Sequence, residues 1–174
     1  MIPIISLVGR KNSGKTTLLL KLIPLLEESE IRVACVKQHK HDVPVDVVGK
    51  DSWMYAQAGA SCSIMSTSTQ LSLVHQRRQM ATLYELAAMA EKSSCNILIG
   101  ESFNSVGTHD NVSRFVVARK DRQEEPRFSP EESCGIITDD SSLAEKWTSA
   151  GKLAFGLNDP RSFASYLCKR CHTL

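Results

Sequence analysis

The stretch Gly9-Arg10-Lys11-Asn12-Ser13-Gly14-Lys15-Thr16 matches the pattern G-x-x-x-x-G-K-[ST] without a gap. The apolar segment 4–8 precedes it and is typical of a buried strand, and the segment 17–23 that follows is typical of a helix. In this context the N–H groups of the loop and of the helix start point into one concavity. The helix dipole adds positive potential there. The stretch therefore predicts a site that binds a nucleoside triphosphate.

Each part of this loop has an expected contact with the nucleotide. Lys15 is expected to reach the β- and γ-phosphates, and the Thr16 hydroxyl is expected to ligate Mg²⁺. The remaining expected nucleotide contacts come from Gly9, Lys11, Asn12, Ser13, Gly14 and Thr17. The competing interpretation is a chance glycine loop between a strand and a helix, and the complete pattern with both flanks argues against it.

A carboxylate near the bound metal is the second requirement of a nucleotide hydrolase. An apolar strand ends in Glu101, which is placed to hold Mg²⁺ or to orient the attacking water; a solvent-facing acid is the alternative. The polar segment 37–52 adds Asp46 as a metal-facing or water-orienting group. Lys37 and Lys50 are cations that can neutralise phosphate charge. The catalytic candidates are therefore Lys15, Asp46 and Glu101, and the metal candidates are Thr16, Asp46 and Glu101.

Strand and helix patterns alternate along the rest of the chain. The predicted strands are 32–37, 63–66, 70–74, 96–101, 111–119, 135–138 and 153–155. The predicted helices are 15–28, 51–58, 80–91, 142–150 and one that starts at Pro160. A capping box of Ser142 and Glu145 is expected to begin the fourth helix. We expect one domain over 1–174 with a three-layer α/β fold of the P-loop NTPase type and a mostly parallel central sheet.

Composition excludes several classes of protein. Lys plus Arg is 21 and Asp plus Glu is 19, so the net charge of +2 gives no argument for a nucleic acid or an anionic membrane as partner. The apolar runs are of strand length, and no signal-peptide pattern is present, so we expect a cytoplasmic protein with no membrane span.

Six cysteines are then expected to remain thiols. The stretch 168–172 matches C-x-x-C-H, and the end of a helix explains it better than haem or a metal.

Taken together, these residues resemble the molybdopterin-guanine dinucleotide biosynthesis protein B (MobB) family over most of the first 105 residues. The phosphate loop is shared by many families, whereas the stretches that follow it are more specific. Those stretches are Lys37, His41 and Asp46 followed by Gly49-Lys50-Asp51-Ser52, then Ala58-Gly59-Ala60 and Glu101-Ser102-Phe103. Three positions depart from the family pattern: Gln38 replaces a frequent histidine, and 101–104 reads E-S-F-N instead of E-G-F-K, which loses a glycine and a lysine.

The resemblance implies a GTP-binding accessory protein of molybdenum-cofactor biosynthesis. It implies binding of GTP and Mg²⁺, slow GTP hydrolysis, a homodimer, and association with the guanylyltransferase (MobA-type protein) that makes the dinucleotide cofactor. The chain has no N-K-x-D or T-K-x-D motif that would select guanine. Asn158-Asp159 is the nearest late acidic loop, and helix capping is its simpler explanation.

Two other functions use the same loop. A small-molecule P-loop kinase would need an arginine-bearing lid, for which Arg77-Arg78 and the segment 119–127 are the candidates. A metal-insertion GTPase would need transition-metal ligands, and His39, His41 and Cys95 are the first candidates. Charged surface loops and solvated histidines are the simpler explanations of both sets.

Overall fold

The computed structural model describes residues 1–39, 43–101, 103, 112–122 and 125–172 of the chain. The chain divides into two compact units, of which the larger is Met1–Gln38 with Thr82–Leu174 and the smaller is His39–Ala81. The single domain expected from the length of the chain stays a prediction.

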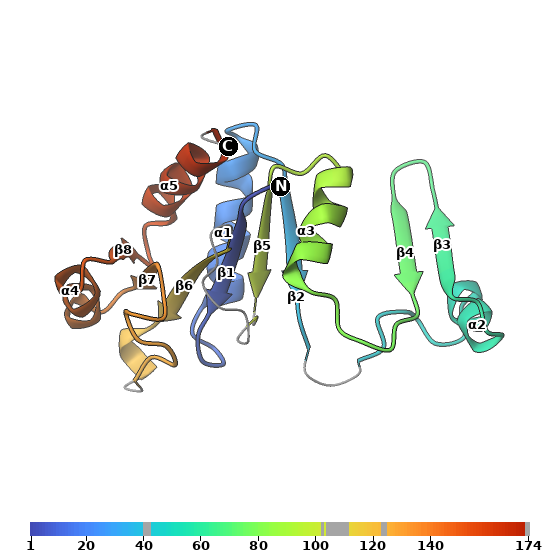
Figure 1. Cartoon of the computed structure of the whole chain (residues 1–174), viewed down its shortest axis with the longest axis horizontal. Coiled ribbons are helices and arrows are strands. Elements are labelled where there is room, and N and C mark those ends of the chain that lie inside the picture. The colour runs from blue at the N-terminus through green and yellow to red at the C-terminus, as the bar shows by residue number, and fades with distance from the viewer. Residues whose placement is uncertain (40–42, 102, 104–111, 123–124, 173–174) are drawn as a thin grey trace. The chain divides into compact units, whose positions relative to one another are not determined.

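The larger unit contains a six-stranded sheet in which every pair of neighbours is parallel (Figure 1). The strand order is β2-β5-β1-β6-β7-β8. The bounds are β1 Ile4–Val8, β2 Val33–Lys37, β5 Ile97–Glu101, β6 Val112–Ala118, β7 Gly135–Thr138 and β8 Leu153–Gly156. This sheet confirms the predicted α/β fold. Because β1 lies between β5 and β6, the loop after β1 lies among the carboxyl ends of both neighbours, where α/β sheets bind ligands.

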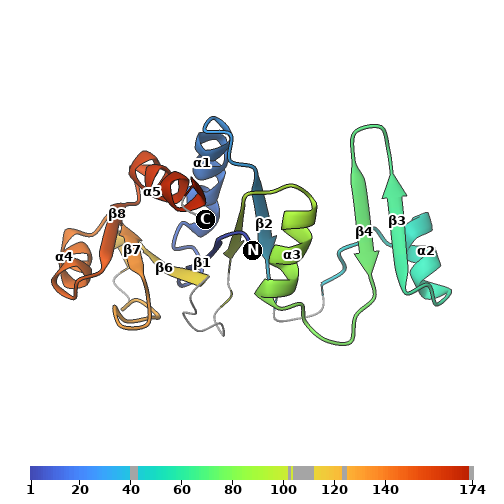
Figure 2. The ribbon, with the colours of Figure 1, turned by 45° about the horizontal axis from the view of Figure 1, so that its top comes forward.

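Helices cover both faces of this sheet (Figures 1 and 2). Side chains alternate along a strand, so Ile5 and Leu7 of β1 face one layer, which α1 and α5 form. On the other face, Ile4 packs with α3 and Val8 packs with α4. The helices are α1 (Lys15–Glu27), α3 (Leu83–Lys92), α4 (Ser141–Ser149) and α5 (Pro160–His172). The result is the expected three-layer arrangement.

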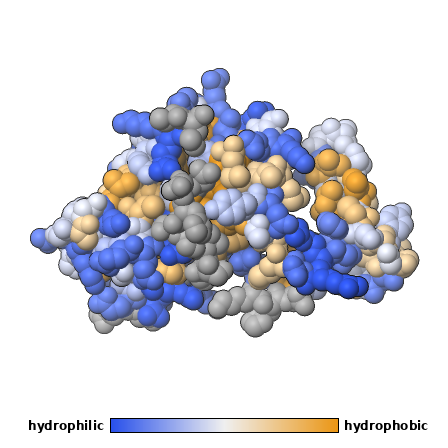
Figure 3. Space-filling view, viewed as in Figure 1, coloured by the Kyte–Doolittle hydropathy of each residue, from blue (hydrophilic) through white to orange (hydrophobic). Residues whose placement is uncertain are grey.

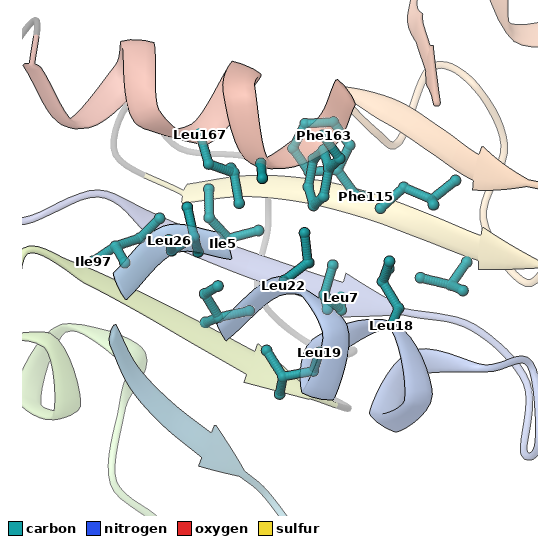
Figure 4. Packing of buried hydrophobic residues seen from close by; sticks show 14 of the residues in the cluster. Ile5, Leu7, Leu18, Leu19, Leu22, Leu26, Ile97, Phe115, Phe163 and Leu167 are labelled. Atoms are coloured by element: carbon teal, nitrogen blue, oxygen red, sulfur yellow. The ribbon is translucent and has the colours of Figure 1, made fainter. Parts of the chain in front are cut away.

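The layer formed by α1 and α5 holds the largest apolar cluster (Figure 4). Leu18, Leu22 and Leu26 recur every four residues on α1, which places them on one face of the helix. Phe163 of α5 meets Phe115 of β6 edge to face, with ring centroids 4.9 Å apart. All five side chains are at most 1% exposed, so α1 is anchored along its length behind the loop that precedes it.

In its described residues, the smaller unit contains one helix and a two-stranded antiparallel hairpin. The elements are α2 (Asp51–Gln57), β3 (Cys62–Ser66) and β4 (Leu71–His75). The Ser63 hydroxyl donates a hydrogen bond to the Ser52 carbonyl over 3.0 Å, which ties β3 to α2. Gly59 has φ of 99° just after α2, and only glycine adopts this conformation readily.

Helix starts differ from the prediction at two positions. The expected capping box of Ser142 and Glu145 is wrong, because α4 begins one residue earlier and the carboxylate of Asp140 accepts the N–H groups of Ser142 and Leu143. A capping box is present instead at α3, between Thr82 and Glu85. Among the described residues, no helix combines the length and the apolar character needed to cross a membrane.

Candidate nucleotide site

The backbone of the loop 9–16 depends on residues that tolerate unusual conformations. Gly14 and Asn12 have φ of 94° and 62°, in the left-handed region that glycine and asparagine adopt at least cost. A Cβ atom on Gly9 would lie 2.4 Å from the carbonyl oxygen of Val117. The loop therefore packs directly against the end of β6, and a side chain at position 9 would force the two apart.

Lys15 is the first residue of α1, and its side chain folds back over the loop. Its ammonium group donates hydrogen bonds to the carbonyl oxygens of Gly9 (3.1 Å) and Arg10 (2.7 Å) and to the hydroxyl of Ser13 (3.2 Å). Burial lowers the pKa of Lys15, while the negative charge of Glu101 opposes that change. The structure thus holds a cation at the centre of the loop, where the phosphates of a nucleotide are predicted to bind.

Thr16, Lys37 and Glu101 come together from three elements. β5 is paired with both β1 and β2, with Glu101 opposite Leu7 on one side and opposite Lys37 on the other. The Thr16 hydroxyl donates to Oε2 of Glu101 over 3.1 Å, and Nζ of Lys37 lies 3.9 Å from the same oxygen. The Glu101 carboxylate is 4% exposed, so it is not the solvent-facing acid of the alternative interpretation.

These groups fit a magnesium ion. Oε1 of Glu101 is buried and has no hydrogen-bond partner among the described residues. A buried carboxylate oxygen without a partner is costly, and coordination to a cation or to its bound water would satisfy it. Mg²⁺ prefers oxygen ligands, keeps several waters and typically uses one or two protein carboxylates. Thr16 and Glu101 are the residues that would hold it.

Asp46 and Lys50 belong to the smaller unit. The Asp46 carboxylate accepts hydrogen bonds from the Ser52 hydroxyl (3.0 Å) and from the N–H of Val47 (2.8 Å). Lys50 immediately precedes α2 and gives it no side-chain cap. Asp46 therefore helps to hold the start of α2, a role that the sequence did not suggest. The expected contacts of Asp46 and Lys50 with metal and phosphate stay predictions.

The signals for a transition metal find no support in the described part of the chain. No group of three or more His, Cys, Asp or Glu side chains that could hold a metal is found among the residues searched. His39 is exposed, Cys95 is half-buried, and His41 lies outside the described residues.

Cys168 and Cys171 of α5 pack against the main apolar cluster. Burial raises the pKa of Cys171 to about 11, so this thiol stays protonated. All six cysteines are free.

Two residues that sequence reasoning missed lie beside the loop. The side chains of Leu157 and Arg119 lie 3.6 and 3.8 Å from the position that a Cβ atom on Gly14 would take. Leu157 follows β8 and Arg119 follows β6, so both come from carboxyl ends of the parallel sheet. An isolated apolar residue after a strand carries no sequence signal, and Arg119 was noted only as part of a possible lid.

Comparison with known proteins gives concordant matches. A family model described as molybdopterin guanine dinucleotide synthesis protein B matches residues 4–139. Molybdopterin-guanine dinucleotide biosynthesis adapter protein from Haemophilus influenzae is 35% identical over 102 residues, 59% of this chain and 57% of that protein. The protein of the same name from Escherichia coli is 32% identical over 121 residues, 68% of this chain and 67% of that protein. The chain thus spans less than two thirds of the length of the H. influenzae relative.

Solved structures show the same fold. The crystal structure of Bacillus subtilis MobB matches with a TM-score of 0.73 at 23% identity, covering 97% of this chain and 98% of that one. The MobB homologue from Bacillus stearothermophilus matches with a TM-score of 0.61 at 20% identity, covering 98% of this chain and 99% of that one. These neighbours confirm the predicted P-loop NTPase fold.

Proposed function

Because the chain belongs to the molybdopterin guanine dinucleotide synthesis protein B family, we propose that it is a GTP-binding adapter of molybdenum-cofactor biosynthesis. The observation that carries this proposal is the meeting of Lys15, Thr16 and Glu101 around one loop. The relatives are named adapter proteins of molybdopterin-guanine dinucleotide biosynthesis, which supports the same role here.

The proposed chemistry is slow, Mg²⁺-dependent hydrolysis of GTP. Bound Mg²⁺ would supply positive charge to the β- and γ-phosphates. Lys15 binds the phosphate oxygens, and Thr16 and Glu101 hold the metal region in place. The ammonium group of Lys37 partly neutralises the negative charge of the Glu101 carboxylate. Asp46 orients the attacking water in this proposal. Water attacks the γ-phosphorus as the bond from this phosphorus to the β–γ bridging oxygen breaks, which gives GDP and inorganic phosphate, and the proton of the water passes to the released phosphate. The loop N–H groups stabilise the charge that develops on the bridging oxygen.

The proposed macromolecular partner is the guanylyltransferase that makes the dinucleotide cofactor. Slow hydrolysis fits an adapter role. A GTP that is hydrolysed slowly stays bound for a long time, and it can then control how long the protein stays in complex with the guanylyltransferase. In line with this partner, we propose a cytoplasmic location.

We propose in addition that the protein is a homodimer, and the hairpin of the smaller unit supports this. A two-stranded hairpin is only marginally stable in water by itself, and α2 is the helix that packs against this one in the described part of the unit. Ile64 lies opposite Leu73 across the hairpin, and these side chains are 60% and 50% exposed. Figure 3 shows apolar surface on this hairpin. A second copy that covers the hairpin would bury these side chains and supply the missing core.

Calorimetric titration with GTP and with ATP, each with Mg²⁺, tests the nucleotide assignment. We expect one GTP to bind per chain more tightly than ATP, with an affinity that falls when Mg²⁺ is omitted. Preference for ATP, together with turnover stimulated by an alcohol acceptor, would favour the small-molecule kinase instead. Binding of neither nucleotide would refute the proposal.

If GTP binds, the next experiment mixes the protein with the guanylyltransferase of the same organism in analytical ultracentrifugation. Complex formation that depends on GTP would support the adapter role. The matched control is the same mixture prepared with the Lys15→Ala variant.

A further inference from the structure

An open pocket lies on the β6 side of the phosphate loop. One wall is the loop itself, through Gly9, Arg10, Lys11 and Ser13. The other walls come from the end of β6 and the segment that follows it, through Val117, Ala118, Arg119, Arg122, Glu125, Pro126 and Arg127. Lys15, Thr16 and Glu101 do not line it. The pocket therefore shares a wall with the proposed nucleotide site but not the residues that would hold the metal and the terminal phosphates.

Positive charge dominates this pocket. Its lining has five cationic side chains, from Arg10, Lys11, Arg119, Arg122 and Arg127, and one acidic side chain, from Glu125. The carboxylate of Glu125 lies 3.6 Å from the ammonium of Lys146, a residue outside the lining, so its charge is already balanced. Arg119 is balanced in the same way by Asp121. The cationic side chains of the described lining still outnumber the acidic one, so this lining favours an anionic ligand.

The far wall of the pocket is held in place by three contacts. Nε of Arg10 donates to the carbonyl oxygen of Glu125 over 3.0 Å, which joins the tip of the phosphate loop to the segment beyond β6. The N–H of Lys120 donates to Asp139 over 2.7 Å, and Arg119 pairs with Asp121 over 3.0 Å. These contacts tie Lys120 to Asp139 and Glu125 to the phosphate loop, and so hold the described wall residues next to them beside the loop.

Arginine side chains at a pocket wall select a planar or tetrahedral oxyanion. Guanidinium groups bind phosphate through paired hydrogen bonds, and Arg is preferred over Lys where this geometry matters. The apolar side chains of Val117, Ala118 and Pro126 form part of the lining and can contact the carbon skeleton of a ligand. The lining chemistry therefore fits a small molecule that has both a phosphate group and an apolar part.

From these observations we infer that the pocket binds a second ligand, a small phosphate monoester, beside the nucleotide. This inference rests on the proposed function, because the position of the second ligand is defined relative to bound GTP. It extends that function by placing a phosphorylated molecule and the nucleotide on opposite sides of one loop. Arg122 and Arg127 are the residues that belong to the second site alone.

Phenyl phosphate is a suitable probe because it has one phosphate and one apolar ring. The experiment titrates it calorimetrically, at fixed ionic strength, into protein saturated with Mg²⁺ and a non-hydrolysable GTP analogue. We expect one phenyl phosphate to bind per chain and phenol not to bind. Arg122→Ala should weaken this binding by at least about tenfold, the loss of one charged hydrogen bond. Its affinity for the GTP analogue should change by less than about twofold.

Arg32→Ala is the matched control, because Arg32 is exposed and precedes β2 at the opposite end of the sheet. Equal weakening in both variants would show a general charge effect and overturn the inference. Competition between phenyl phosphate and the GTP analogue would show that the pocket belongs to the nucleotide, and absence of binding would also overturn it. If the GTP analogue itself does not bind, the proposed function fails, and titration without nucleotide then tests the pocket separately.

Discussion

The hydroxyl of Thr16 donates a hydrogen bond to Oε2 of Glu101 over 3.1 Å, although the two residues are 85 positions apart. Thr16 lies in the first turn of α1, and Glu101 is the last residue of β5. Pairing of β5 with β1 brings them together, with Leu7 opposite Glu101. The two halves of the proposed nucleotide site are therefore brought together by one strand pair.

Glu101→Gln should reduce Mg²⁺-dependent GTP turnover by about ten- to hundredfold, the usual range for loss of a group that supports a metal. The amide keeps the size of the side chain and an oxygen that can accept from Thr16, so the fold should be unchanged. The measurement is turnover against Mg²⁺ concentration, with Glu145→Gln, at an exposed position of α4, as control. Wild-type Mg²⁺ dependence in Glu101→Gln would remove Glu101 from the metal region.

Lys15→Ala should weaken GTP binding by at least about tenfold, because one charged hydrogen-bond donor to phosphate is lost. The same change removes three hydrogen bonds from Lys15 to the loop. Thermal unfolding should therefore be measured as well, to separate a loss of stability from a loss of GTP binding. Lys21→Ala, an exposed lysine on the same helix, is the control. Tight Mg-GTP binding with unchanged turnover in Lys15→Ala would contradict the central assignment.

Asp46→Ala should slow GTP hydrolysis more than it weakens GTP binding, if Asp46 orients the attacking water. Asp46→Asn separates this role from the structural one, because the amide oxygen can still accept from Ser52 and Val47. Steady-state turnover and calorimetric affinity are measured for both variants. Full activity of Asp46→Asn would show that Asp46 acts only by holding the start of α2, and equal losses in rate and affinity would also exclude the water-orienting role.

Ile64→Lys should convert the proposed dimer to a monomer, because it places a charge in the apolar surface of the hairpin. Sedimentation velocity at several protein concentrations measures the change. Thr69→Lys, in the exposed turn of the same hairpin, controls for the added charge. A wild-type protein that sediments as a monomer would refute the dimer directly.

Thr82→Ala should lower the free energy of unfolding by about 1 kcal/mol, the usual cost of losing a helix N-cap. Thr82 accepts the N–H of Glu85 over 3.2 Å, and Glu85 accepts the N–H of Thr82 over 2.7 Å. Urea denaturation measures the change, and Thr82→Ser, which keeps the hydroxyl, should retain most of the stability. Equal destabilisation by Ala and Ser would show that the methyl group rather than the cap is responsible.

Local capping patterns predicted the helix starts only in part, because more than one residue near a helix start can accept the same N–H groups. The α3 capping box follows the pattern T-x-x-E at 82–85, so the sequence contains the signal for this helix start. At α4, the pattern S-x-x-E at 142–145 gave the wrong start. Asp140, two residues earlier, competes for the same N–H groups, and its carboxylate binds two of them.

The sequence alone determined the phosphate loop, its flanking strand and helix, the strand that ends in Glu101, and the alternating pattern of an α/β fold. Hydrophobic periodicity and glycine positions carry this information, and both act over a few residues. Tertiary structure decided that Thr16, Lys37 and Glu101 meet, that Leu157 and Arg119 lie beside Gly14, and that Arg122 and Arg127 line a pocket with the loop. These relationships depend on the order β2-β5-β1-β6-β7-β8. Strand order follows from how all the apolar faces are buried together, and no single segment of the chain contains that information.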